Sequence, residues 1–193
     1  MKTRIISIIL TAILILFALS GCNQEEKPQD ESTSEPTQET TTAPDSTPEL
    51  TTEPPPEYIT IKGEQYSTDL TKLVLVNKEL TNDDIEPLKY MTNLTELALV
   101  QNQISDISAL SGLTNLTDLA LAQNYISDIS ALRGLTNLTA LTIYGNAISD
   151  IGALRGLNNL TRLHLFDNPL HEAQIAELQT ALPDCEIIFN LTS

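Results

Sequence analysis

The most constraining feature of this chain is a segment of 22 residues that occurs three times in succession. The copies read MTNLTELALVQNQISDISALSG (91–112), LTNLTDLALAQNYISDISALRG (113–134) and LTNLTALTIYGNAISDIGALRG (135–156). One such unit cannot bury its apolar face alone, whereas stacked units bury a continuous core. The repetition therefore predicts a solenoid in which the repeated letters build the scaffold and the variable letters carry function.

The pattern LxxLxLxxNxI/L marks leucine-rich repeats of roughly 20–29 residues. It is complete four times in this chain, with its asparagines at Asn102, Asn124, Asn146 and Asn168. An earlier unit, Leu70–Leu80, keeps the leucines but has Lys78 at the asparagine position. Two extra residues follow that unit before the frame resumes at Leu94. Because terminal repeats are often atypical, we expect about five coils, the first of which begins at Leu70.

Each letter of the repeat has a physical role in the predicted coil. Alternation along a strand points Leu97 and Leu99 inward and Ala98 and Val100 outward. The asparagines are expected to satisfy turn backbone groups of their own and adjacent coils, because buried backbone groups need partners. The segment SDISAL is expected to begin a 3₁₀ turn with Ser or Asp at its cap. The capping candidates are Ser105/Asp106, Ser127/Asp128 and Ser149/Asp150.

Both ends of the predicted solenoid carry segments suited to covering an exposed core. YITIKGEQY (58–66) alternates around a glycine turn and predicts a strand or hairpin. Near the other end, a helix with one apolar face is predicted, stopped by Pro183, and EIIF (186–189) follows as a last strand. The apolar face contains Ile175, Leu178 and Leu182. We expect a repeat domain over 58–193, with caps at about 58–69 and 171–193.

These residues resemble the internalin-type class of 22-residue leucine-rich repeats found on bacterial surface proteins, over roughly 70–186. The resemblance implies an α/β fold: a right-handed curved solenoid with a parallel sheet on its concave face and 3₁₀ turns on its convex face. It also implies that the concave face recognises a protein partner. In contrast to larger members, we expect only about five coils here, and a lipid anchor in place of a wall-sorting signal.

The first 22 residues have the features of a signal peptide. Two cations precede an apolar run from Ile5 to Leu19, which is short for a bilayer span. The letters LSGC, ending at Cys22, resemble the lipobox of bacterial lipoproteins, which implies cleavage before Cys22 and lipidation of its sulfur. We therefore expect an extracytoplasmic protein, lipid-anchored to the bacterial membrane and exposed at the cell surface. An ordinary signal peptide with an incidental cysteine is the alternative. A lipidated Cys22 leaves Cys185 unpaired, as a buried structural thiol.

Residues 23–57 are predicted to form a disordered spacer. They contain ten acids, one lysine and seven of the ten prolines, so they cannot offset the entropy cost of ordering. At about 3.1 Å per residue such a segment reaches on the order of 100 Å. The domain after it has sixteen acids against seven bases. That charge excludes nucleic acid as a partner and disfavours direct docking on anionic lipid.

Function is expected at the outward strand positions, which form three columns on the concave face. They are Lys72, Glu96, Asp118, Ala140 and Arg162; Val74, Ala98, Ala120, Thr142 and His164; and Val76, Val100, Ala122, Tyr144 and Phe166. Eight of the ten residues in the second and third columns are apolar, which is unusual for a solvent-facing sheet. Aromatic anchors with a charged rim suit a protein interface. The predicted contact residues are Glu96, Val100, Asp118, Ala122, Thr142, Tyr144, Arg162, His164 and Phe166.

Several alternatives stay open at this point. Val, Tyr and Phe also fit a pleated surface by propensity, so a passive envelope scaffold or display spacer is the alternative to an adhesion or recognition protein. An enzyme or a protease inhibitor ranks third, because no nucleophile–base pair or phosphate loop is evident. His164, Asp167 and His171 lack metal-ligand spacing, and capping explains one Asp per coil better than calcium does. The first four NLT triplets, at Asn93, Asn115, Asn137 and Asn159, belong to the repeat's turn rather than to glycosylation. We predict a monomer that binds a protein or peptide, with no cofactor, metal or enzymatic activity.

Overall fold

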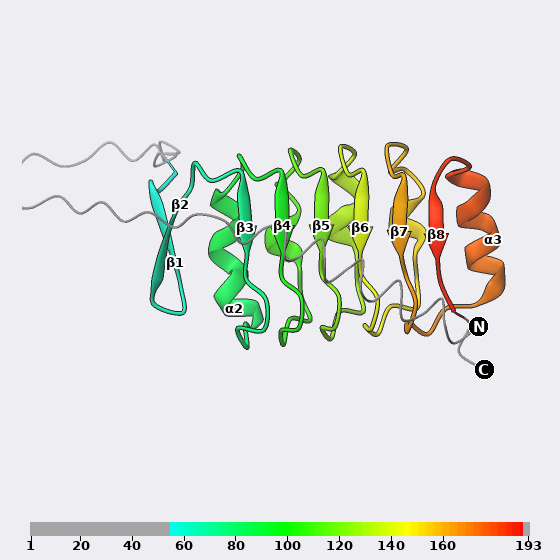
Figure 1. The fold of residues 1–193 in the computed structure, drawn as a ribbon, viewed down its shortest axis with the longest axis horizontal. Helices are drawn as coiled ribbons and strands as arrows, with labels where there is room; N and C mark the ends of the chain where they lie inside the picture. Colours follow the sequence, from blue (N-terminus) through cyan, green and yellow to red (C-terminus); the bar gives the residue numbers. More distant parts are fainter. Residues whose placement is uncertain (1–54, 191–193) are drawn as a thin grey trace, which may run out of the picture. The chain divides into compact units, whose positions relative to one another are not determined.

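The structure is a computed structural model that describes residues 55–190, in which six parallel strands form one sheet in chain order (Figure 1). The strands are β3 (Lys72–Val74), β4 (Glu96–Ala98), β5 (Asp118–Ala120), β6 (Ala140–Thr142), β7 (Arg162–His164) and β8 (Glu186–Ile188). Each repeat contributes one strand, and the predicted C-terminal strand contributes the last. The predicted fold class, a leucine-rich-repeat solenoid, is confirmed. The predicted signal peptide, Cys22 and all but the last three residues of the spacer lie outside the described residues.

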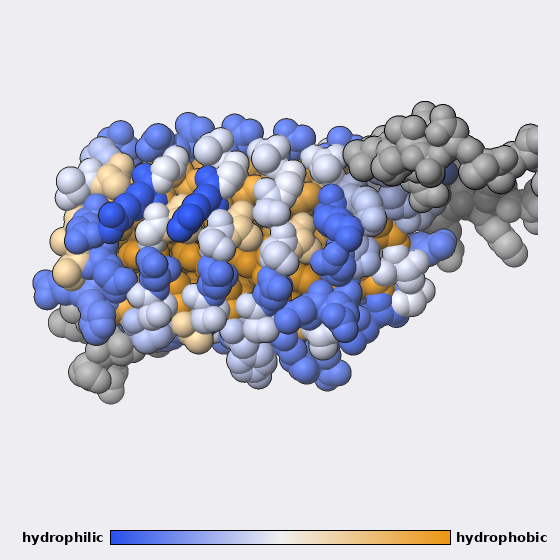
Figure 2. All heavy atoms as spheres, turned by 180° about the vertical axis from the view of Figure 1, so that it is seen from behind, coloured by the Kyte–Doolittle hydropathy of each residue, from blue (hydrophilic) through white to orange (hydrophobic). Residues whose placement is uncertain are grey.

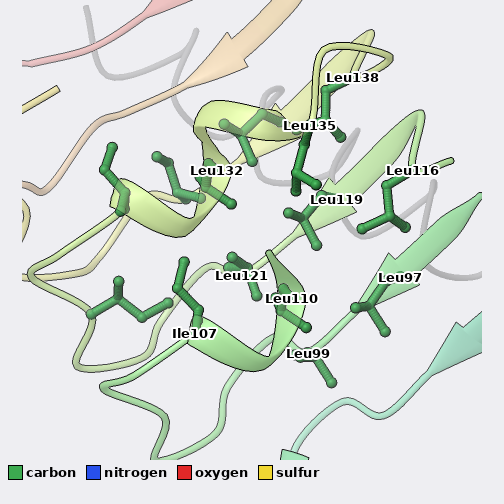
Figure 3. Close-up of a cluster of buried hydrophobic side chains, with 14 of the residues drawn as sticks. Leu97, Leu99, Ile107, Leu110, Leu116, Leu119, Leu121, Leu132, Leu135 and Leu138 are labelled. Carbon is green, nitrogen blue, oxygen red and sulfur yellow. The ribbon is translucent and has the colours of Figure 1, made fainter. Parts of the chain in front are cut away.

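The register of the sheet places the equivalent leucines of successive coils side by side. Leu73 pairs with Leu97, Leu97 with Leu119, Leu119 with Leu141, and Leu141 with Leu163. None of these five side chains is more than 5% exposed. Together with the apolar residues of the turns they fill the interior between the sheet and the opposite side of each coil (Figure 3). The predicted inward column of leucines is therefore confirmed.

Short helical turns form the side of the solenoid opposite the sheet. The 3₁₀ turns are η1 (Glu86–Tyr90), η2 (Ser108–Leu110), η3 (Ser130–Gly134) and η4 (Gly152–Leu154). In the repeats, the aspartate side chain accepts a hydrogen bond from the first backbone N–H of the 3₁₀ turn. Asp106 Oδ1 accepts a hydrogen bond from the Ser108 backbone N–H at 2.8 Å, and Asp128 and Asp150 make the same contact. The predicted 3₁₀ turns are confirmed, and the capping role belongs to Asp rather than Ser.

The first coil has an α-helical turn because it is two residues longer than the others. This helix, α2 (Asn82–Ile85), precedes η1 and buries Ile85 completely. The Thr81 backbone N–H donates to Asp84 Oδ2 at 2.8 Å, and this hydrogen bond is the main reason that the pKa of Asp84 is lowered. Lys62 Nζ lies 3.0 Å from the same carboxylate. The insertion that breaks the sequence period thus supplies a longer, self-capped turn.

The repeated asparagines join successive coils, as predicted. Asn124 Nδ2 donates to the Leu99 carbonyl of the preceding coil at 2.8 Å and to the Leu121 carbonyl at 3.0 Å. Its Oδ1 accepts from the Ile104 backbone N–H of the preceding coil at 3.1 Å. Equivalent contacts are made by Asn102, Asn146 and Asn168. The first coil follows a hairpin rather than another coil, which removes the need for an amide and explains Lys78.

A second series of hydrogen bonds between coils runs along the TNLT turn. Asn115 Nδ2 donates to the Thr92 carbonyl at 2.8 Å, and the next two copies repeat this contact. The Thr117 hydroxyl donates to the Thr95 carbonyl at 3.1 Å, again with repeats in the following coils. The NLT triplets of the repeats are therefore engaged in tying neighbouring turns together.

The hairpin and the helix predicted at the two ends of the repeats are present. The hairpin of β1 (Tyr58–Ile61) and β2 (Glu64–Ser67) is antiparallel and buries Ile59 and Ile61 against the first coil. At the other end, α3 (Glu172–Ala181) buries its predicted apolar face, made of Ile175, Leu178 and Leu182. An apolar solenoid end needs such covers to stay soluble.

The turn side of the solenoid is mostly polar at its outermost points (Figure 2). Hydrophilic side chains lie along the coils, and hydrophobic residues are visible in the grooves between them. One ion pair, between Arg155 and Glu177, joins the last repeat to α3. Within residues 55–190, no helix has the length and apolarity needed to cross a membrane.

Candidate functional site

The variable residues of the repeat lie on the outward side of β3–β8, which we call the sheet face and which corresponds to the predicted concave face. Pairing places Glu96 beside Asp118, then Ala140, then Arg162. The second column is paired in the same way, as far as His164. Backbone hydrogen bonds from residues 101, 123 and 145 to the next coil keep the third column in line. The three predicted columns are thus real, with a step of about 4.8 Å.

The charged residues of the first column pair with one another. Lys72 Nζ lies 3.1 Å from Glu96 Oε2. Arg162 extends past the small Ala140 towards Asp118, with a nitrogen–oxygen distance of 3.9 Å. Exposed ion pairs of this kind contribute only about 0–1 kcal/mol to stability. Their main effect is to fix where charge lies along one edge of the sheet face.

The third column ends in a stacked aromatic pair. The rings of Tyr144 and Phe166 have centroids 4.1 Å apart and an interplanar angle of 12°. Both side chains are half-buried, so part of each ring faces solvent. Burial raises the pKa of the Tyr144 hydroxyl, and the negative charge of Asp167 raises it further. A rigid aromatic surface of this kind is what protein interfaces use as an anchor.

Two of the predicted contact residues present almost no surface to a partner. Ala122 is 0% exposed and Val100 is 5% exposed. Ala122 lies in the third column between Val100 and Tyr144. The accessible part of the site is therefore narrower than predicted. It consists of Thr142, Tyr144, His164 and Phe166, with Glu96, Asp118 and Arg162 along the edge.

His164 lies on the sheet face two residues before Phe166 and is half-buried. Its Nδ1 atom is buried and has no hydrogen-bond partner among residues 55–190. Burial lowers the pKa of His164; the negative charge of Glu186 opposes this shift, and the positive charge of Arg162 adds to it. Burial therefore favours the neutral imidazole at the aromatic end of the sheet face.

Strand β8 adds a sixth row to the sheet face that the sequence columns did not include. Glu186 pairs with Arg162, and Ile188 pairs with His164. Ile188 is half-buried, and the following Phe189 is 40% exposed. The signal for this row was present, because EIIF was predicted as a strand. Extending the columns by one parallel step would have added Glu186 and Ile188 to the site.

The other side chains considered as possible functional groups are buried or already engaged in hydrogen bonds within the fold. Cys185 is 4% exposed, and burial raises the pKa of its thiol, with a smaller contribution from Glu186. In the part of the chain that the structure describes, no three His, Cys, Asp or Glu side chains are arranged to hold a metal ion. A shallow depression on the turn side is lined by Ser127, Asp128, Ile129, Ser130, Arg133, Asp150 and Ala153. Asp128 and Asp150 are already engaged there in capping.

Comparison with known proteins supports the same architecture. A family model described as leucine-rich repeats (2 copies) matches residues 92–134. The chain is similar to the crystal structure of internalin C2 from Listeria monocytogenes, with 35% identity, a TM-score of 0.60, and coverage of 64% of this chain and 53% of that chain. It is also similar to another internalin (inlF) from Listeria monocytogenes, with 26% identity, a TM-score of 0.50, and coverage of 68% and 46%. A search of curated proteins gives no match.

A third solved structure, a leucine-rich-repeat protein from Leptospira interrogans, is 28% identical with a TM-score of 0.50. The match covers 54% of this chain and 27% of that structure's chain. The chain spans about half the length of the two internalin structures, 53% and 46%. Proteins of this architecture are usually binding domains rather than enzymes. Residues 55–190 are thus an internalin-like leucine-rich-repeat solenoid with an aromatic, partly charged end on its sheet face.

Proposed function

We propose that this chain is an extracytoplasmic bacterial lipoprotein whose sheet face binds a protein or peptide partner. The observation that carries the proposal is the stacked, half-buried Tyr144–Phe166 pair on the outward side of the sheet. Burial of aromatic surface is favourable, so a partner that covers the exposed parts of the two rings gains binding free energy. The similarity to internalin structures supports a binding role.

The proposed location rests on the N-terminal sequence. An apolar run ending in LSGC, with Cys22 as the lipidated residue, predicts export and attachment to the membrane. The acidic, proline-rich segment after it would hold the repeat domain away from the bilayer. A surface protein presented in many copies gains avidity, so a small aromatic site is sufficient for adhesion or recognition.

A site-specific photocrosslinking experiment tests the binding role. The photoreactive residue p-benzoylphenylalanine replaces Thr142, on the sheet face, in the full chain on cells. A matched control carries the same residue at Ser130, which is exposed on the turn side. We expect a discrete covalent adduct from position 142, none from position 130, and loss of the adduct when Phe166→Ala is added.

Other outcomes of this experiment contradict the proposal. Equal adducts from both positions, or an adduct at position 142 that Phe166→Ala does not affect, would mean that the sheet face does not select a partner. Absence of any adduct would favour a passive envelope scaffold. Mass spectrometry of the adduct identifies the partner.

The anchor is tested separately from the binding site. Cells are labelled with an alkyne analogue of palmitate, and the full chain is compared with Cys22→Ala. We expect label and membrane association for the natural chain and neither for the variant. Equal membrane association of both chains, without label, would show that Cys22 is not an anchor.

A further inference from the structure

We propose that the C-terminal end of the sheet face binds a basic segment of its partner, with one Lys or Arg side chain against the Tyr144–Phe166 stack near Asp167 and a second basic side chain at Glu186. This inference rests on the proposed function and adds the charge of the ligand to it. Glu186 lies in the first column, about 13 Å along the strands from the third column that ends in the stack. Asp167 directly follows Phe166 in the chain.

Neither carboxylate is neutralised within residues 55–190. The neighbour of Glu186 in the sheet is Arg162, yet the Arg162 guanidinium is directed to Asp118 at 3.9 Å and forms no ion pair with Glu186. Asp167 Oδ1 accepts a hydrogen bond from the neutral amide of Asn190 at 2.7 Å. Both side chains are exposed, so their charge is available to a partner.

The resulting field at the aromatic end is negative. Asp167 follows Phe166, whereas Asp118 and Glu186 lie in the first column, where Arg162 is paired with Asp118. The charge of Asp167 raises the pKa of Tyr144, and the charge of Glu186 opposes the lowering of the pKa of His164. Burial favours the neutral form of the His164 imidazole, which limits its contribution of positive charge.

A cation is the ligand that satisfies both parts of this surface. The face of an aromatic ring attracts Lys or Arg by about 0.5–1 kcal/mol when exposed and about 2 kcal/mol when desolvated. The carboxylates of Asp167 and Glu186 each add charge-assisted hydrogen bonds to a basic side chain of the segment. Ile188, which pairs with His164, provides apolar surface for an aliphatic residue between them. A segment that alternates basic and aliphatic residues fits this description.

The same charges disfavour the other obvious occupants. The chain's own residues 23–57 contain ten acids and one lysine, and they would bring negative charge to a negative site. A second copy of the domain, with sixteen acids and seven bases over 58–193, is opposed for the same reason. Charge complementarity therefore selects a different, basic protein or peptide.

Three matched peptides test the inference: Ac-GRLRLRG-amide, Ac-GQLQLQG-amide and Ac-GELELEG-amide. Each carries a fluorophore, and its binding to the full chain in neutral detergent micelles is followed by fluorescence anisotropy at low and high salt. We expect the arginine peptide to bind about tenfold more tightly than the glutamine peptide at low salt, and the glutamate peptide not to bind. A tenfold difference corresponds to about 1.4 kcal/mol.

Two charge-matched double variants locate the effect. Asp167→Asn with Glu186→Gln removes the two site carboxylates, and it should abolish the preference for arginine. Asn tolerates the left-handed backbone of residue 167, where φ is 55°, so the fold is preserved. The control, Glu79→Gln with Glu172→Gln, changes the net charge equally at exposed positions away from the site and should retain the preference.

Each result is decisive for one of the two proposals. Equal binding of the arginine and glutamine peptides, no binding of any peptide, or an equal loss in the control variant overturns the basic-ligand inference. The binding role itself still stands if the adduct at position 142 forms and depends on Phe166. If that adduct is missing as well, both proposals fail.

Discussion

The side-chain amide of Asn124 donates a hydrogen bond to the carbonyl of Leu99, one coil earlier, at 2.8 Å. Asn124 is only 5% exposed, so water cannot replace this contact. Asn124→Ala leaves several backbone groups of two coils without partners, and each buried unsatisfied group costs about 1–3 kcal/mol. We expect the free energy of unfolding to fall by about 2–4 kcal/mol, measured by urea denaturation.

Asn146 provides the matched comparison for this prediction. It makes the same contacts but is partly exposed, so water can satisfy some of the groups that Asn146→Ala leaves behind. The loss should be smaller than that of Asn124→Ala. An equal or larger loss at position 146 would show that burial does not set the strength of these contacts.

The stacking of Tyr144 on Phe166 should be measurable as a coupling energy. A double-mutant cycle with Tyr144→Ala and Phe166→Ala should give about 0.5–1.5 kcal/mol, because aromatic pairs contribute this much beyond their buried area. Thermal or urea unfolding of the four proteins supplies the values. Tyr144→Ala combined with Tyr125→Ala is the control, since Tyr125 is 67% exposed and outside the stack. Additive effects in the first cycle would contradict the stacked arrangement.

Stability should decrease as the pH falls through the titration range of an unfolded histidine. Burial places the pKa of native His164 below its ordinary value of about 6.5. Below pH 6.5 the unfolded chain therefore binds a proton that the native chain does not, and unfolding is favoured until the native imidazole also titrates. His164→Gln should flatten the dependence of the unfolding free energy on pH between about 5.5 and 7. An NMR titration of the His164 ring with a midpoint above 6.5 would contradict this.

Cys185 should be inert towards thiol reagents in the native protein. Its side chain is 4% exposed, and its pKa is raised by burial and by Glu186, so both access and thiolate formation are restricted. Reaction with Ellman's reagent should be slow in buffer and rapid in urea. The Cys22→Ala chain is used so that Cys185 is the one reporter. Rapid labelling without denaturant would show that the C-terminal cap opens readily.

The repeat made most of the fold predictable. The inward leucines, the asparagine contacts and the 3₁₀ turns each follow from a local rule that recurs every 22 residues, so Leu119 or Asn124 can be assigned without knowing the rest of the chain. The two-residue insertion in the first coil was visible as well. Its outcome, the helix α2, depends on the Thr81–Asp84 contact, which a repeat pattern does not contain.

The site was predictable only in part. Column membership follows from alternation, which predicts that Tyr144, His164 and Phe166 lie on the sheet face. Accessibility depends on the size of neighbours in adjacent coils, which is why Ala122 and Val100 were assigned to a surface from which they are shielded. The direction of the Arg162 side chain could not be predicted either, because it lies near Asp118 and forms no ion pair with the adjacent Glu186.

The repeated asparagine side chains donate hydrogen bonds to carbonyl groups of the preceding coil. The amide of Asn124 bonds to the carbonyl of Leu99, and that of Asn146 to the carbonyl of Leu121. A coil therefore has its backbone groups satisfied only when the asparagine of the following coil is in place. A solenoid truncated after any of these repeats would end in one coil whose carbonyl groups lack that amide.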